Sequence, residues 1–176
     1  MISERAKDSF GRIFMGAARS RLPASESHSC EIVELPAGAS QPQAQIVVLT
    51  ISSMQFRLLL LLHFDDDASM RDYYAADASR PLTEAFMEVA NLCCGAINQQ
   101  LVEHFPDLGM STPYALSSAC VPHLTELKPD HVVSYDLSIN GSVRIGATLC
   151  LCTKAALDFV ADEAVAAESG GELELF

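Results

Sequence analysis

The chain has 176 residues and a mass of 19.0 kDa, the size of a single ordinary domain. Hydrophobic residues make up 49% of it and charged residues 19%, so it can bury a sizeable core, which excludes wholesale disorder. Eleven basic residues against 23 acidic ones give a net charge of −12. This excess of negative charge disfavours binding to nucleic acid and to anionic membrane surfaces.

The N-terminus and the cysteines indicate a cytoplasmic protein. The first eight residues mix both charge signs and lack an apolar stretch, so we expect no signal peptide. The longest apolar run, around Leu58–Leu62, is far shorter than the roughly 20 residues that a membrane-spanning helix needs. The six cysteines form no repeated CxxC pairs, so we expect buried thiols in a reducing compartment rather than disulfides.

The first half of the chain is predicted to form a helix, three strands and a short helix. Apolar residues recur at helical spacing from Ser3 to about Arg21. Strands are predicted at Cys30–Leu35, Gln45–Ile51 and Met54–Phe64, and the last two form a hairpin. The short helix is predicted over Ala68–Ala76.

Two short motifs raise the question of a metal site. The run Asp65-Asp66-Asp67 could bind calcium, but it directly precedes the short helix, where acidic side chains cap the N-terminus and meet its dipole. The motif Cys120-Val-Pro-His123 could supply two zinc ligands, but no second pair lies nearby in the sequence. We therefore predict no metal site in this chain.

The second half repeats the same order of elements. Its predicted elements are a helix from about Pro81 to Phe105, a short strand over Ala115–Cys120, a hairpin of His131–Ile139 and Ser142–Cys152 turning at Asn140-Gly141, and a helix from Lys154 to about Ala167. Gly170-Gly171 and an acidic tail follow.

Matching positions in the two halves indicate an internal duplication. At one constant offset, the first helix carries Arg5, Ser9, Arg12, Gly16 and Arg19 where the second carries Glu84, Glu88, Asn91, Gly95 and Asn98. The segment Asp72–Ala75 likewise echoes Asp158–Ala161. We predict an α/β (α+β) fold of duplicated α-β-β-β-α units, with a mixed sheet flanked by two long helices. A single domain would span 1–169, with pseudo-repeats at about 3–76 and 81–167 and the tail at 170–176.

The second long helix carries one narrow polar stripe on an otherwise apolar surface. Glu84, Glu88 and Asn91 fall on this stripe, together with Gly95, Asn98 and Gln99, and no Lys or Arg occurs from 82 to 105. Glu88 and Asn91, three residues apart, project side by side. We expect both to be exposed, with Leu92 and Cys93 beneath them. Gly95 costs about 1 kcal/mol relative to Ala but would let another surface approach beside Asn91.

A carboxylate beside a carboxamide suits one kind of chemistry. The carboxylate of Glu88 can bind a partner's ammonium group, whereas the neutral amide of Asn91 both donates and accepts hydrogen bonds. The amide can therefore approach an anionic phosphoryl group and orient a water for in-line attack. Positioning that water is much of what a protein must supply for phosphoryl hydrolysis.

The run Glu88-Val-Ala-Asn91-Leu-Cys-Cys-Gly95 resembles the ExxN-xxx-G helix signature of the CheC/CheX chemotaxis phosphatase family. The following Gly109-Met-Ser-Thr-Pro113 resembles the strand entry after that helix in CheX-like members. The resemblance implies a pseudo-twofold fold and hydrolysis of the aspartyl phosphate of a CheY-type receiver.

The same resemblance implies a role for each site residue. Glu88 would bind the receiver's active-site Lys, and Asn91 would position the attacking water. Glu84, Gly95 and Asn98 would contact the partner. The chain itself would hold no cofactor, because the Mg²⁺ would belong to the receiver.

The sequence departs from the family pattern in two places. Many members have Asp or Ser where this chain has Glu84, and whether that charge strengthens or weakens docking stays open. The first helix has Ser9 and Arg12 in place of the key pair, so we expect one active site. We interpret Arg5, Arg12 and Arg19 as a structural or partner-pairing face rather than as a second site.

Three hypotheses about function follow from these residues. The first is a phosphatase that acts on a phosphorylated CheY-like receiver through Glu88 and Asn91. The second is a non-catalytic module of the same fold that docks on a receiver or a flagellar-switch-like partner. The third is a structural or oligomeric domain in which the polar stripe is simply solvated. The sequence leaves a homodimer open.

Overall fold

The computed structural model describes residues 1–77 and 79–161 of the chain. Its elements, in chain order, are α1 (Glu4–Arg21), β1 (Cys30–Glu34), β2 (Gln45–Ser52), β3 (Phe56–Phe64), α2 (Ala68–Tyr74), α3 (Leu82–Leu101), β4 (Gly109–Met110), β5 (Tyr114–Ser117), the 3₁₀ helix η1 (Ser118–Leu127), β6 (His131–Ile139) and β7 (Val143–Thr153). None of the helices in this part of the chain is both long and apolar enough to cross a membrane.

The seven strands form one sheet in the order β1-β6-β7-β3-β2-β4, and β5 also pairs with β2. Every strand pair is antiparallel, so the predicted mixed sheet is wrong. The reason is that tight hairpins join β2 to β3 and β6 to β7, and a hairpin makes its two strands antiparallel. The strand order has pseudo-twofold symmetry, because β1, β6 and β7 on one side correspond to β4, β2 and β3 on the other.

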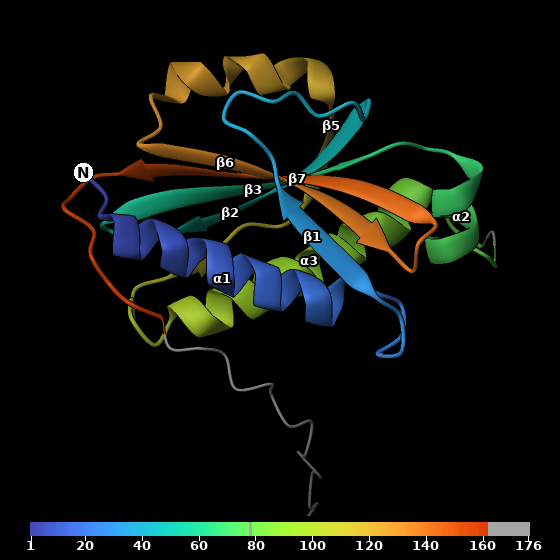
Figure 1. The fold of residues 1–176 in the computed structure, drawn as a ribbon, viewed down its shortest axis with the longest axis horizontal. Helices are drawn as coiled ribbons and strands as arrows, with labels where there is room; N and C mark the ends of the chain where they lie inside the picture. The colour runs from blue at the N-terminus through green and yellow to red at the C-terminus, as the bar shows by residue number, and fades with distance from the viewer. Residues whose placement is uncertain (78, 162–176) are drawn as a thin grey trace, which may run out of the picture.

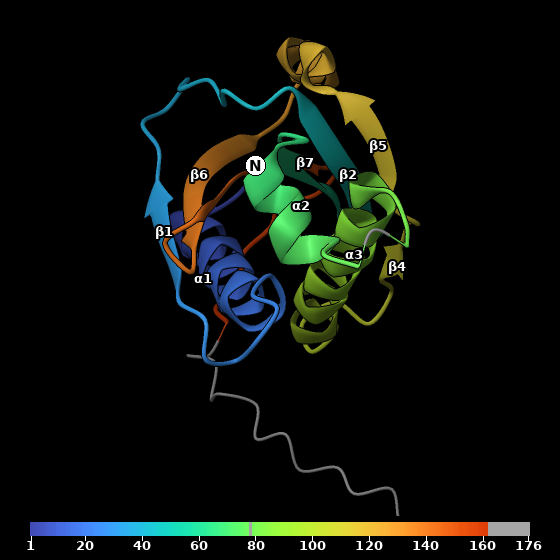
Figure 2. The ribbon, with the colours of Figure 1, turned by 90° about the vertical axis from the view of Figure 1, so that its right-hand side faces the viewer.

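The helices lie in one layer against the sheet. Figures 1 and 2 show α1 and α3 side by side on one face of the sheet, with η1 on the opposite face. Figure 2 also shows β1 at the edge near α1, and β4 and β5 at the edge near α3. The main core fills the space between the two long helices and the sheet, and its largest members include Phe10, Phe14, Phe56 and Phe86. Each long helix therefore presents one outer stripe beside its own sheet edge.

Local sequence signals explain several of these elements. The Ser3 Oγ accepts a hydrogen bond from the N–H of Ala6 at 3.1 Å, which caps α1. Asn140 and Gly141 both have positive φ angles, 51° and 68°, as a two-residue hairpin turn requires.

The three aspartates before α2 have structural partners. The carboxylate of Asp67 caps α2 through the N–H of Met70, at 2.9 Å. Asp66 pairs with Arg71, and Asp65 accepts a hydrogen bond from the N–H of Ala44. This supports capping over calcium binding. Within 1–77 and 79–161, no group of three or more His, Cys, Asp or Glu side chains is arranged to hold a metal ion.

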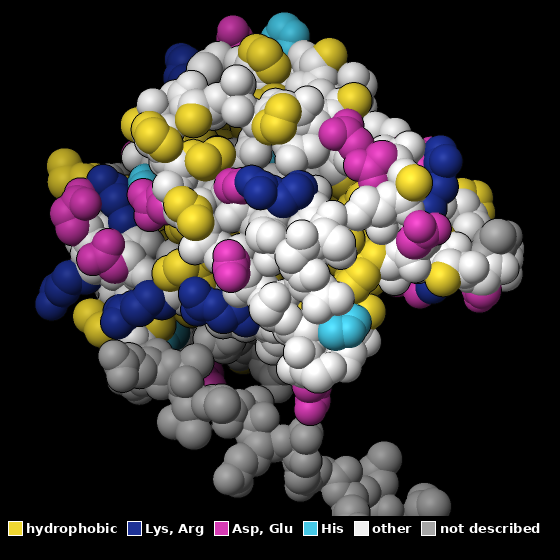
Figure 3. All heavy atoms as spheres, turned by 45° about the vertical axis from the view of Figure 1, so that its right-hand side comes forward, with side chains coloured by type: hydrophobic (Ala, Val, Ile, Leu, Met, Phe, Trp, Pro, Cys, Tyr) yellow, Lys and Arg dark blue, Asp and Glu magenta, His cyan; other side chains and the backbone are white. Residues whose placement is uncertain are grey.

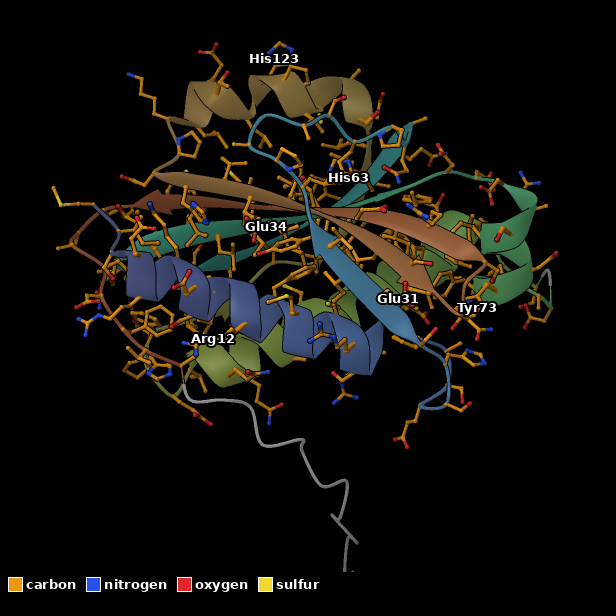
Figure 4. All side chains as sticks on the ribbon, in the orientation of Figure 1. Arg12, Glu31, Glu34, His63, Tyr73 and His123 are labelled. Carbon is orange, nitrogen blue, oxygen red and sulfur yellow. The ribbon has the colours of Figure 1, made fainter. Side chains whose placement is uncertain are left out.

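The helix η1 was not predicted from the sequence. The predicted strand over Ala115–Cys120 ends at Ser117, and the chain then forms 3₁₀ turns with Pro122 inside them. Side chains of η1 pack on a small second core on the outer face of the sheet, formed by Ile46, Val48 and Leu61. Figure 4 shows His123 on η1 and His63 within the sheet region below it. Burial lowers the pKa of His63 to about 4.

The helix predicted from Lys154 to Ala167 is wrong over residues 154–161, which contain no helix. Contacts with the N-terminus hold this segment extended instead: Leu157 forms a bridge with Ile2 and backbone hydrogen bonds with Met1 and Ser3. The remainder of that predicted helix and the tail at 170–176 lie outside the described residues. The echo between Asp72–Ala75 and Asp158–Ala161 therefore joins a helical segment to a non-helical one.

All six cysteines are free thiols, but the prediction that they are buried holds for only half of them, because Cys30, Cys120 and Cys152 are half-buried. Cys93, Cys94 and Cys150 are buried, and burial raises the pKa of each thiol well above its ordinary value. These three side chains therefore act as small apolar groups in the core.

Candidate functional site

A shallow groove of about 310 Å³ runs along α3 at the site that the sequence predicted. Glu84, Met87, Glu88 and Asn91 line one side of it, and Pro113 in the connection from β4 to β5 lines the other. Residues three and four apart on a helix share one face, which is why these four side chains meet. The fold thus sets a carboxylate and a carboxamide beside an open space.

Glu88 is exposed and makes one ion pair. Its Oε1 lies 2.5 Å from the Nη1 of Arg80, the residue just before Pro81 and α3. The Glu88 side chain is 65% exposed and the Arg80 side chain 41%, so water surrounds the pair. The hydrogen bond to the Glu88 carboxylate raises the pKa of Arg80, and the negative charge of Glu88 raises it further. Exposed pairs of this kind contribute about 0.2–1 kcal/mol, so the carboxylate can exchange partners at small cost.

The prediction that both side chains are exposed holds for Glu88 but not for Asn91, which is half-buried at the edge of the exposed stripe. Its side chain makes no hydrogen bond with any residue of the described ranges, and its amide lines the groove beside Glu88. A free carboxamide keeps both its donors and its acceptor available for a partner or a water.

The prediction that Leu92 lies beneath Glu88 and Asn91 is wrong, although Cys93 is fully buried as expected. Leu92 is 57% exposed. It follows Glu88 by four residues and therefore lies one helical turn further along the same outer face. The exposed stripe of α3 thus contains an apolar side chain next to its charged one.

The other predicted contact residues differ in position. Glu84 is exposed in the groove, one turn before Glu88. A Cβ added at Gly95 would meet no atom within 4 Å, so the helix surface beside Asn91 is open there. Asn98 is outside the groove, and its buried Oδ1 has no hydrogen-bond partner in the described part of the chain.

Two residues of the groove, Met87 and Pro113, and its neighbour Arg80 were not predicted. Arg80 lies just before the helix, outside the segment 82–105 that contains no Lys or Arg, although a basic residue one turn before Glu84 was a usable signal. Met87 was grouped with neither face of the helix. Pro113 was quoted only as part of a strand entry, and its place opposite Asn91 follows from the pairing of β4 and β5 with β2.

Structural comparison identifies the fold. No protein-family model and no curated protein matches the sequence. Among solved structures, the chemotaxis protein CheX from Vibrio vulnificus matches with a TM-score of 0.58 and 15% identity, over 81% of this chain and 99% of that one. A CheC-like superfamily protein from Shewanella sp. PV-4 matches with a TM-score of 0.56 and 11% identity, over 85% and 99%.

A third match is the CheX–CheY–BeF₃–Mg²⁺ complex from Borrelia burgdorferi, with a TM-score of 0.54 and 10% identity over 83% of this chain and 97% of that one. The chain has the CheC/CheX-type fold. This confirms the architecture that the Glu88–Asn91 motif predicted by resemblance.

Within this CheC/CheX-type fold, α1 is the counterpart of α3, but the position on α1 that matches Glu88 is covered. Ser9, which corresponds to Glu88, is fully buried. Its Oγ accepts a hydrogen bond from the N–H of Ala161 at 3.0 Å and donates to the backbone oxygen of Arg5 at 2.7 Å. The side chain of Arg5 pairs with Asp158. The segment after β7 therefore covers the position on α1 that stays open on α3.

Proposed function

We propose that this protein is a phosphatase that hydrolyses the aspartyl phosphate of a CheY-type receiver. The observation that carries the proposal is the pair of side chains that line the groove of α3 in a CheC/CheX-type fold: an exposed carboxylate that can exchange its partner, beside a half-buried carboxamide without one. In the reaction, a water oxygen attacks phosphorus and the bond from phosphorus to the aspartate oxygen breaks. The products are inorganic phosphate and a free aspartate on the receiver.

Glu88 docks the helix by binding the ammonium group of the receiver's active-site lysine. This lysine replaces Arg80, whose exposed ion pair contributes at most about 1 kcal/mol. The ammonium group of the partner's lysine then pairs with the Glu88 carboxylate in place of the Arg80 guanidinium. Leu92 and Pro113 flank the docked carboxylate and provide apolar contact area around it.

Asn91 supplies the chemistry. Its neutral amide enters the receiver's pocket without repelling the phosphoryl oxygens, and it orients the attacking water by accepting a hydrogen bond from it. The Mg²⁺ of the reaction belongs to the receiver, where it neutralises charge on the phosphoryl oxygens. This chain contributes the position of the water and the geometry of docking, in the cytoplasm, where receivers act.

The proposal is tested by mixing the protein with phosphorylated receivers from the same cell and measuring phosphate release. We expect release well above that of the receiver alone for at least one receiver. Equal release with and without the protein, together with stable binding, would instead favour the non-catalytic docking module.

A pair of variants then tests the docking role of Glu88. Glu88→Gln removes the charge that binds the lysine and should raise KM about tenfold with little change in kcat. Arg80→Ala removes the competing cation and should lower KM by up to about fivefold, the equivalent of an exposed ion pair. A rise of KM in both variants would contradict exchange of Arg80 for the receiver's lysine.

A further inference from the structure

A second hollow lies beside α1, on the opposite edge of the sheet from the groove of α3. Its volume is about 580 Å³. The edge strand β1 ends at Glu34, opposite Tyr135, so the first residues of β6, including His131 and Val133, have no β1 residue beside them and line the hollow. The hollow is the pseudo-symmetric counterpart of the α3 groove. At the sequence offset that relates α1 to α3, Asp8 corresponds to Met87 and Glu34 corresponds to Pro113, and these two residues line the groove.

The floor of the hollow is the hydroxyl of Tyr135. The exposed fraction of Tyr135 is only 2%. Its ring packs on the ring of Phe14, with 5.0 Å between the two ring centroids. Its hydroxyl makes no hydrogen bond with any residue that the structure describes. Gly11 lies directly over it, because a Cβ at Gly11 would come within 3.0 Å of the hydroxyl oxygen. The hydroxyl belongs to the lining of the hollow and is not enclosed by the protein, so it is available to a ligand there.

Two carboxylates line the hollow around this hydroxyl, in a lining that also holds Arg5, Lys7 and Arg12. Asp8 on α1 and Glu34 on β1 stand on opposite walls, and neither forms an ion pair or side-chain hydrogen bond within residues 1–77 and 79–161. Burial, together with the charges of Glu34 and Asp8, raises the pKa of Tyr135 to about 12, so the hydroxyl is neutral near pH 7. An approaching cation would find two carboxylates and one oxygen acceptor.

The basic groups around the hollow do not occupy this position. Arg5 pairs with Asp158, and Lys7 pairs with Glu4 at 2.7 Å. Figure 4 shows Glu34 above α1 and Arg12 below it, so Arg12 lies at the rim of the hollow, on the opposite side of α1 from Glu34. Burial, followed by the charge of Lys7, lowers the pKa of His131, which is therefore neutral at pH 7. Figure 3 shows a row of Lys and Arg side chains along the lower left of the molecule, with Asp and Glu side chains above the row.

We propose that this hollow binds a primary ammonium or guanidinium group. The cation lies between the carboxylates of Asp8 and Glu34 and donates a hydrogen bond to the hydroxyl of Tyr135. Val133 and Met15 form apolar walls that pack against the methylene chain carrying the cation. The ligand is either a free small amine or the Lys or Arg side chain of another protein. This site is separate from the groove of α3 and does not depend on its function.

The test is an NMR titration of the full chain with two probes, agmatine and the blocked tripeptide acetyl-Gly-Arg-Gly-amide. We expect saturable amide shifts centred on Gly11 and Tyr135 with at least one probe. Binding of agmatine indicates a free amine, whereas binding of the tripeptide alone indicates a protein side chain. No saturable shift with either probe, or shifts centred elsewhere, would overturn the proposal.

Variants separate the site from general attraction to an acidic protein. Tyr135→Phe should weaken binding about tenfold, because it removes a hydrogen bond to a charged group. Asp8→Asn and Glu34→Gln should each weaken it about fivefold. Glu31→Gln is the matched control. Glu31 is also exposed on β1, but side chains alternate along a strand, so Glu31 lies on the opposite face of β1 from Ile32 and Glu34. Equal weakening by Glu31→Gln, or wild-type affinity in Tyr135→Phe with an unchanged thermal midpoint, would contradict the site.

Discussion

The outer stripes of α3 and α1 occupy equivalent places in a pseudo-twofold fold, yet the position of Glu88 on α3 is open and the matching position of Ser9 on α1 is covered. On α3, Glu88 and Asn91 face an open groove. On α1, the corresponding Ser9 is buried under the backbone of Phe159–Ala161. The same helix position is therefore left open on α3 and used as an anchoring point on α1, and the segment that follows the hairpin of each half decides which.

The two segments differ because of their partners. After β3 the chain forms α2, whose Tyr74 packs on Phe86 near the start of α3 and leaves Glu88 uncovered. After β7 the chain stays extended, because Leu157 pairs with Ile2 and Asp158 accepts a hydrogen bond from Ser3. The Nη2 of Arg12 also donates a hydrogen bond to the Ser9 Oγ, at 3.4 Å, so partners on α1 and on the segment after β7 both occupy this hydroxyl.

Alanine substitutions at these equivalent positions give the largest expected contrast in stability. Ser9→Ala removes the acceptor of the buried Ala161 N–H and should lower the free energy of unfolding by about 1–2 kcal/mol. Glu88→Ala removes only an exposed ion pair and should change it by about 0.5 kcal/mol or less. Urea unfolding of both variants measures the difference. Equal losses would show that α3 is anchored as firmly as α1.

A smaller effect is expected from pH on the segment that closes α1. Hydrogen bonds from Ser3 and Arg5 lower the pKa of Asp158 below 3.8. Because the folded-state pKa is the lower one, the ionised carboxylate stabilises the closed segment above pH 3.8, and this stabilisation is lost as the pH falls through the lowered pKa. Amide-exchange protection at Leu157 and Ala161 should therefore fall below about pH 4, before that of α3.

Asp158→Asn is the control for this pH effect. Its protection at Leu157 and Ala161 should be lower at neutral pH and change little with acid. If the wild type and the variant lost protection in parallel, the carboxylate of Asp158 would not be what holds the segment.

The elements that depend on local sequence were predictable. Helical spacing of apolar residues located α1 and α3, and Asn140-Gly141 located the hairpin of β6 and β7. The polar stripe without lysine or arginine led to Glu88 and Asn91, which the structure brings together in one groove. Periodicity and turn chemistry act over a few residues, so a single sequence contains them.

The features that were missed depend on contacts between distant segments. Residues 154–161 have an apolar pattern compatible with a helix, but Leu157 pairs with Ile2 across the whole length of the chain. Pro122 and the lack of strand alternation left η1 without a clear signal. Leu92 was assigned to the core from its apolarity, although the core of α3 was already filled on the opposite side by residues such as Phe86 and Cys93.

The central claim, that α3 is the catalytic face, is tested most directly by comparing two amide-to-alanine variants of this helix. Asn91 lines the groove, whereas Gln99 is exposed further along α3 and outside it. Phosphate release from a phosphorylated receiver should fall about 100-fold or more in Asn91→Ala with binding retained, as expected when a group that positions the reacting atoms is lost. Gln99→Ala should stay within about twofold of wild type. Equal rates in the two variants would contradict a catalytic role for Asn91.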